Sequence, residues 1–98
     1  MTLFHESFTL AAATPKIIAT IPEGNPLTSV QITNVNAASV YIGDSSVTTT
    51  GSADRGIKIP TDSTKEIWLN AGDVLYAVSA AGTSSSFDVA VLYSKVVD

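Results

Sequence analysis

Lys65-Glu66-Ile67-Trp68-Leu69-Asn70-Ala71-Gly72-Asp73-Val74-Leu75-Tyr76-Ala77-Val78-Ser79 is the stretch that decides the fold class. Two short runs rich in β-branched and aromatic residues flank a four-residue segment of typical turn residues. The pattern predicts an antiparallel hairpin in which Leu69 lies opposite Val74. Because side chains alternate along a strand, one face of this hairpin would belong to the core and would hold Ile67, Leu69, Val74, Tyr76 and Val78.

The end of the chain extends this pattern. Apolar residues at Phe87, Val89, Val91 and Tyr93 alternate with the residues between them. Alternation with period two is typical of a strand that is buried on one side. We therefore expect a third strand beside the hairpin, giving a three-stranded meander.

Earlier in the chain, alternating or β-branched runs predict strands at 1–10, 16–21, 28–34, 40–43 and 57–60. Residues 28–34 and 40–43 are expected to form a second hairpin, and residues 11–15 a connector. The Ser/Thr-rich segment Asp44–Gly56 is expected to be a loop that carries specificity or adapts to a neighbour. Together the strands predict an all-β fold with one domain over residues 1–98. This domain would be an antiparallel β-sandwich or a small jelly-roll-like barrel of seven to eight short strands. The expected core is Phe8, Ile17, Val30, Ile32, Val40, Ile42, Ile67, Leu69, Val74, Tyr76, Val78, Phe87, Val89 and Val91.

Composition narrows the functional classes. Of the 98 residues, 45% are hydrophobic and only 14% charged, and the net charge is -4. The five basic residues are scattered singly, so nucleic-acid binding, which depends on neutralising phosphates, is not expected. There is no cysteine, and no run of about 18 apolar residues predicts a membrane span. The first fifteen residues show no secretory leader pattern, so we expect synthesis and folding in a cytoplasm.

Catalytic and metal-binding patterns were also considered. His5 is the single histidine, and no Gly-x-Ser-x-Gly motif accompanies it, so a solvent-facing strand position is expected. Asp44, Asp54 and Asp62 lack the spacing of a calcium loop and are expected in turns. Two further acids, Asp73 and Asp88, are expected to be a turn cap and a solvent-facing strand residue. The sequence thus predicts a protein that is not an enzyme, without catalytic residues, a cofactor or a metal.

A family resemblance rests on three stretches: Val30–Asn34 (VQITN), Val40–Gly43 (VYIG) with Val47-Thr48, and Leu69–Ser79 (LNAGDVLYAVS). In this order they resemble small all-β virion proteins of tailed bacteriophages, in which such stretches recur in head-decoration, minor capsid and fibre modules. The resemblance covers residues 28–94. It implies a small structural protein on the virion, on the exterior of the capsid, where it would bind the major capsid protein or other virion proteins and stabilise the capsid.

Three hypotheses remain open from the sequence. The first is a capsid decoration (cementing) protein, made in the host cytoplasm and located on the head. The second is a tail, baseplate or fibre component with a receptor-binding role. The third is a soluble carbohydrate-binding module, in which Trp68 or Tyr41 would be the stacking platform.

A contact surface is predicted from the second face of the meander. If Leu69 pairs with Val74, apolar residues that point away from the core continue across neighbouring strands, whereas outward positions elsewhere are polar. A crossing segment such as residues 1–10 could cover this patch, or another molecule could. The sequence favours an intermolecular contact and a homo-oligomer, and the phage resemblance favours a trimer. The interface candidates are Trp68, Leu75, Ala77, Ala90 and Leu92.

Overall fold

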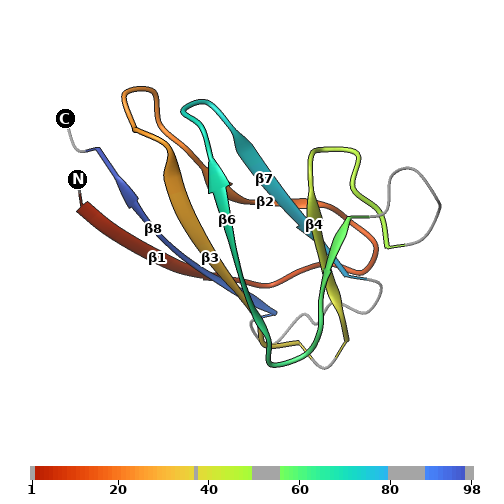
Figure 1. Cartoon of the computed structure of the whole chain (residues 1–98). Helices are drawn as coiled ribbons and strands as arrows, with labels where there is room; N and C mark the ends of the chain where they lie inside the picture. The colour runs from red at the N-terminus through yellow and green to blue at the C-terminus, as the bar shows by residue number, and fades with distance from the viewer. Residues whose placement is uncertain (1, 37, 50–55, 80–87, 97–98) are drawn as a thin grey trace.

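The computed structural model describes residues 2–36, 38–49, 56–79 and 88–96 and contains eight strands in two four-stranded sheets (Figure 1). The described residues form one compact all-β sandwich without a helix, as the sequence predicted. The strands are β1 (Thr2–Phe8), β2 (Lys16–Thr20), β3 (Thr28–Asn34), β4 (Val40–Gly43), β5 (Ile57–Ile59), β6 (Thr64–Leu69), β7 (Val74–Val78) and β8 (Val89–Lys95).

The strand order defines the topology. One sheet, called sheet A below, has the order β1-β8-β3-β6, and the other, sheet B, has the order β2-β7-β4-β5. All pairs are antiparallel, and β1 pairs with β8, β2 with β7, β3 with β6 and β4 with β5. This nested pairing is that of an eight-stranded jelly roll, in which a long antiparallel ribbon rolls up into two facing sheets. The more specific of the two predicted architectures is therefore the one observed.

The two predicted hairpins are wrong. Strand β6 pairs with β3 in sheet A, whereas β7 pairs with β2 and β4 in sheet B, so Leu69 and Val74 are not partners. The next predicted member of the meander, β8, lies between β1 and β3 in sheet A. In the same way, β3 and β4 belong to different sheets. Each of these short connections carries the chain from one sheet across to the other.

The turn between β6 and β7 is formed as predicted, although it joins two sheets. Gly72 has φ +88°, a backbone conformation that a glycine adopts readily. The Asp73 carboxylate accepts a hydrogen bond from the Asn70 amide at 2.7 Å, which confirms Asp73 as a turn cap. Two backbone bonds then attach this turn to the end of β2: Gly72 N donates to Ile21 O at 2.8 Å, and Ile21 N donates to Asp73 O at 2.9 Å. The turn is therefore a corner of the sandwich.

Strand β7 shows the other error of prediction. Its sequence VLYAV is apolar at every position, so alternation does not identify the inner face. In the structure Leu75 and Ala77 face the core, whereas Val74 is 39% exposed and Tyr76 is half-buried. Both faces of the strand are thus exchanged relative to the prediction. The exchange removes Leu75 and Ala77 from the predicted contact surface.

The remaining core predictions divide as follows. Val30, Ile32, Val40, Ile42, Val89 and Val91 are buried in the central cluster, as predicted. Val78 is buried but lies outside that cluster, and Phe8, Ile67 and Leu69 are partly buried against it. Ile17 is 46% exposed because a register shift between Ile17 and Ala19 turns Ile18 and Ala19 inward. Phe87 lies outside the described residues. The core also contains residues not predicted for it: Leu10, Ile18, Ala19, Ile21, Ile59, Leu75, Ala77 and Tyr93.

Two buried polar side chains connect the ends of the strands. Asn34 donates to the carbonyls of Ile59 at 2.8 Å and Ala38 at 3.0 Å. Asp88 was predicted to face solvent, but it is fully buried and accepts a hydrogen bond from the Leu10 amide at 2.7 Å. Because a buried amide without a partner is costly, these side chains replace bonds that the sheets do not supply at their ends.

Candidate interaction surfaces

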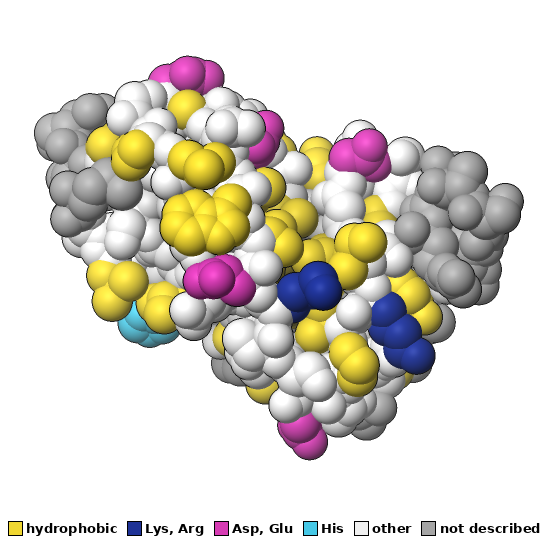
Figure 2. All heavy atoms as spheres, viewed as in Figure 1, with side chains coloured by type: hydrophobic (Ala, Val, Ile, Leu, Met, Phe, Trp, Pro, Cys, Tyr) yellow, Lys and Arg dark blue, Asp and Glu magenta, His cyan; other side chains and the backbone are white. Residues whose placement is uncertain are grey.

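The outer face of sheet A carries the remaining members of the predicted contact surface. Trp68 on β6 is 59% exposed, Leu92 on β8 is 36% exposed, and Ala90 on β8 is half-buried. Leu3 on β1, at 65%, lies on the same face and was not among the candidates. Figure 2 shows hydrophobic side chains gathered on the part of the visible surface around β6, with few charged groups between them.

Strand register places these residues relative to one another. Trp68 lies opposite Ser29, and Leu92 lies opposite Gln31 on one side and His5 on the other. Polar side chains thus separate the large apolar ones, and Glu66, the other register partner of Gln31, is among them. Ser29 donates a hydrogen bond to the Glu66 carboxylate at 2.6 Å, so the acid on this face is held close to the sheet.

The outer face of sheet B carries apolar side chains along β7 and the start of β2. Val74 and Tyr76 follow each other at two-residue spacing on β7, and Ile17 of β2 is the register partner of Tyr76. The segment after β4 folds back over this face, because Val47 packs where a side chain on Gly43 would lie, 3.1 Å from the position of a Cβ atom there. This explains why Val47 is buried although it lies outside the central core cluster.

A third feature is a cluster of aromatic and lysine side chains at the open side of the sandwich, between β1 and β2. A cavity of about 170 Å³ lies there, lined by residues of β1, β2 and β8. The rings of Phe4 and Tyr93 meet edge to face at 5.3 Å, and the Lys95 ammonium lies 3.7 Å from the centre of the Phe4 ring. Lys16 lies over Phe8 at 5.9 Å. Cation–π contacts of this kind let lysine cover aromatic faces at the rim of a core, so we interpret this cluster as structural.

The candidates for catalytic or metal-binding chemistry in the described residues are His5 and the acidic side chains. His5 is exposed on β1, as predicted, where it faces Leu92 of β8. Within the described residues, no three of His, Asp or Glu come together as a possible metal site. Asp44 forms the expected turn, and the hydroxyl and amide of Ser46, which donate to its carboxylate, lower the pKa of Asp44. The described residues contain no helix that is long and apolar enough to cross a membrane.

The two aromatic residues considered as sugar platforms do not form one site. Trp68 lies on the outer face of sheet A, whereas Tyr41 lies on β4 of sheet B as the register partner of Val78 and Lys58. Tyr41 is also half-buried. A carbohydrate site would therefore have to use either aromatic residue alone.

Comparison with known proteins adds no relative: no protein-family model, no curated protein and no solved structure matches this chain.

Two features of these surfaces were missed from the sequence. The apolar outer face of β7 was missed because it was taken for core. Its signal was present as an uninterrupted apolar strand, a pattern typical of strands that are covered on both sides. Leu3 was missed because the strand at residues 1–10 was considered as a possible cover for the apolar patch rather than as part of it.

Proposed function

We propose that this chain is a structural virion protein of a tailed bacteriophage, a capsid decoration protein bound to the exterior of the head. One observation carries the proposal: the residues of the phage-like motif form interior strands and a corner of the sandwich. The motif strands β3, β4 and β7 are interior strands of their sheets. The residues that resemble the phage proteins are thus residues that build the sheets of the sandwich.

Four Asn, Gly and Asp residues of the motif have structural roles. Asn34 bridges backbone carbonyls at the sandwich end. Gly43 leaves room for Val47. Gly72 adopts its positive φ, and Asp73 caps the same corner. A protein whose polar motif residues hold its own fold, and whose outer faces carry exposed apolar side chains such as Trp68 and Val74 among polar ones, suits a role in assembly better than one in turnover of a substrate.

The outer face of sheet A, which carries Trp68 and is called the Trp68 face below, has a size that favours a contact within an assembly. Four strands about 4.8 Å apart and seven residues long at about 3.3 Å per residue cover roughly 400 Å². A stable pairwise interface buries about 800 Å² on each partner, so this face alone supports only weak pairing. On a particle, several such contacts act together, and weak single contacts then hold a subunit firmly. The homo-oligomer, with a trimer favoured, belongs to the same proposal.

Purified particles test the proposal. Virions are isolated by density gradient from lysates of the phage or induced prophage that encodes the chain, and their proteins are quantified by mass spectrometry. We expect the chain in the particles at a copy number comparable to that of the major capsid protein. Cryo-electron microscopy should place it on the head. A chain that is expressed during infection but absent from the particles would overturn the proposal, and density on the tail would favour the fibre alternative.

A variant pair tests the contact face. Trp68→Ala removes an indole that is 59% exposed, and Ile57→Ala removes a side chain that is 56% exposed on β5 of sheet B. Truncation of a Trp at the centre of an interface costs about 2 kcal/mol or more. That cost is roughly a 30-fold loss of affinity for particles. We expect this loss for Trp68→Ala, while Ile57→Ala binds like the parent. Equal binding of both variants would show that sheet A does not face the capsid.

A further inference from the structure

Sheet A ends on each side in a strand with one free edge. Within the described residues, β1 pairs only with β8, and β6 pairs only with β3 (Figure 1). β1 has seven residues and β6 has six, and neither strand contains proline or glycine. A free edge of this length offers backbone groups to which a further strand can be added.

Backbone hydrogen bonds show which groups point away from sheet A. Phe8 O accepts from Asp88 N at 2.8 Å, so alternate residues of β1, counted from Phe8, direct their backbone groups toward β8. The free edge of β1 therefore carries the amides and carbonyls of Leu3, His5 and Ser7. In the same way, Asn34 N donates to Ser63 O at 3.0 Å at the end of β6. The free edge of β6 therefore carries those of Thr64, Glu66 and Trp68.

The two free edges have the directions that a shared sheet needs. Neighbouring strands of sheet A are all antiparallel, so β1 and β6, at the two ends of the four-strand order, run in opposite directions. The β1 edge of one copy can therefore join the β6 edge of a second copy as a further antiparallel pair. Side chains on the inner face of one copy then lie on the same side of the sheet as those of the other.

On the inner face, one register joins opposite charges. Phe4, Glu6 and Phe8 line the same cavity, so Glu6 points to the interior side of β1. On β6, Ile67 packs against the core, so Lys65, two residues before it, points to the same side. Both Glu6 and Lys65 are exposed. Placing Glu6 opposite Lys65 also sets Phe4 opposite Ile67, so a charge pair and an apolar pair form together.

The same register matches the outer face. It sets His5 opposite Glu66 and Leu3 opposite Trp68. Leu3, at 65%, and Trp68, at 59%, are the two most exposed large hydrophobic side chains among the described residues. A shift of two residues in either direction, the smallest that keeps each face on its own side, loses both charge pairs. The side chains therefore select one register.

We propose that this chain assembles head to tail, with β1 of one copy added to β6 of the next in the register that places Glu6 opposite Lys65. About six backbone hydrogen bonds then join each pair of copies, and sheet A continues from copy to copy. Because the contact uses two different edges, it closes into a ring when the rotation between copies allows and otherwise continues as a row. This inference rests on the proposed function for the existence of a homo-oligomer, whereas the choice of edges rests on their side chains.

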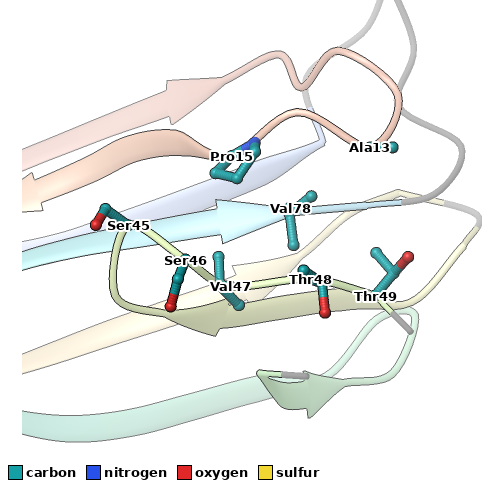
Figure 3. Close-up of a pocket in the computed structure, with 8 residues that line it drawn as sticks. All are labelled: Ala13, Pro15, Ser45, Ser46, Val47, Thr48, Thr49 and Val78. Carbon is teal, nitrogen blue, oxygen red and sulfur yellow. The ribbon is translucent and has the colours of Figure 1, made fainter. Parts of the chain in front are cut away.

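Other pairings match less well. Two β1 edges would leave Glu6 without a cation, because β1 contains no lysine or arginine. Two β6 edges cannot pair Lys65 with Glu66, since adjacent residues lie on opposite faces. Sheet B offers poorer edges, because β5 has three residues and a register shift interrupts β2. Figure 3 shows that its own chain also occupies part of that surface, with Pro15 and residues 45–49 on either side of the end of β7.

Charge reversal tests the register. Glu6→Lys and Lys65→Glu each place like charges opposite one another, so we expect either variant to associate at least about fivefold more weakly than the parent in sedimentation velocity. An equimolar mixture of the two variants should associate again, because each edge then meets an opposite charge on the other variant. Glu23→Lys, in the turn between β2 and β3, makes the same charge change as Glu6→Lys and should leave association unchanged.

A cysteine pair measures the contact directly, since the chain has no cysteine of its own. Ser7 and Thr64 lie opposite each other across the proposed contact. Within one copy they lie in the same row at opposite edges of sheet A, three strand spacings or about 14 Å apart, too far for a disulfide. Ser7→Cys/Thr64→Cys should therefore link separate copies when the oxidant diamide is added. The matched control Ser7→Cys/Thr33→Cys, one strand farther in, should cross-link at least tenfold more slowly.

The results separate this contact from the proposed function. If the two charge variants associate as the parent does, if their mixture gains nothing, or if both cysteine pairs cross-link at the same low rate, the contact is overturned. The proposed function then still stands where the chain is found on virions. Association that is lost in the variants and regained on mixing, in a chain that is absent from virions, would retain the contact and overturn the proposed function.

Discussion

Substitutions on β7 give the most direct test of the structure, because the structure and the predicted Leu69–Val74 hairpin disagree about which side chains face the core. We consider Leu75→Ala and Val74→Ala. Leu75 is 5% exposed and belongs to the core cluster, whereas Val74 is 39% exposed. Cutting a buried leucine to alanine costs about 2 to 5 kcal/mol. Val74 loses two methyl groups that are only partly buried, at about 0.8 kcal/mol for each group when fully buried, so its cost should be about 1 kcal/mol or less.

Thermal unfolding followed by circular dichroism measures the difference. In a domain of 98 residues, 1 kcal/mol shifts the melting temperature by roughly 4 to 8 °C. Leu75→Ala should therefore lower the melting temperature by at least about 8 °C, and Val74→Ala by no more than about 8 °C. Val91→Ala is the matched control, since it makes the same deletion as Val74→Ala at a core residue that is 2% exposed. If Val74→Ala melted as low as Val91→Ala, or Leu75→Ala no lower than Val74→Ala, the inner face of β7 would be the one that the predicted Leu69–Val74 hairpin assigns.

Two further predictions concern polar side chains. Asp88→Ala should lower the free energy of unfolding in guanidinium by about 1 to 3 kcal/mol, because it leaves the buried Leu10 amide without its acceptor; a loss below about 0.5 kcal/mol would contradict this. The Asp44 carboxylate should titrate below its usual pKa in NMR, and Ser46→Ala should raise that pKa again by removing the hydroxyl donor. Because the folded pKa is the lower one, the stabilisation from this turn is present above the usual carboxyl pKa and is lost as the pH falls through the folded value. An unchanged Asp44 pKa in Ser46→Ala would contradict the assigned cause.

The strands could be predicted well from the sequence, and the pairing could not. The ranges predicted for β3 and β4 agree with the structure, and the other strands differ only at their ends. Alternation and turn residues are local signals that mark where a strand begins and ends. The partner of a strand depends on contacts between residues far apart in the chain. The corner at Asn70–Asp73 illustrates the difference: its sequence specifies a turn, but its attachment to Ile21, far away in sequence, makes it cross between the sheets.

The buried polar residues were unpredictable for a related reason. Asp88 was expected to face solvent because an acid between apolar strand residues usually does so. In the structure it immediately precedes β8 and accepts a hydrogen bond from Leu10, which lies 78 positions earlier in the sequence. No local sequence pattern around Asp88 shows that the Leu10 amide lies beside it and needs an acceptor. Turn acids such as Asp44 and Asp73, which bond within three residues of themselves, were predicted correctly for the opposite reason.

Strand β7 shows the physical reason for the main error in the predicted core. A strand that is wetted on one side needs only one apolar face, and its inner residues Leu75 and Ala77 already supply it. The outer face of β7 is nevertheless apolar, and the described part of the chain buries Val78 while it leaves Tyr76 half-buried and Val74 39% exposed. Apolar side chains on both faces are the reason that the inner face of β7 was ambiguous in the sequence.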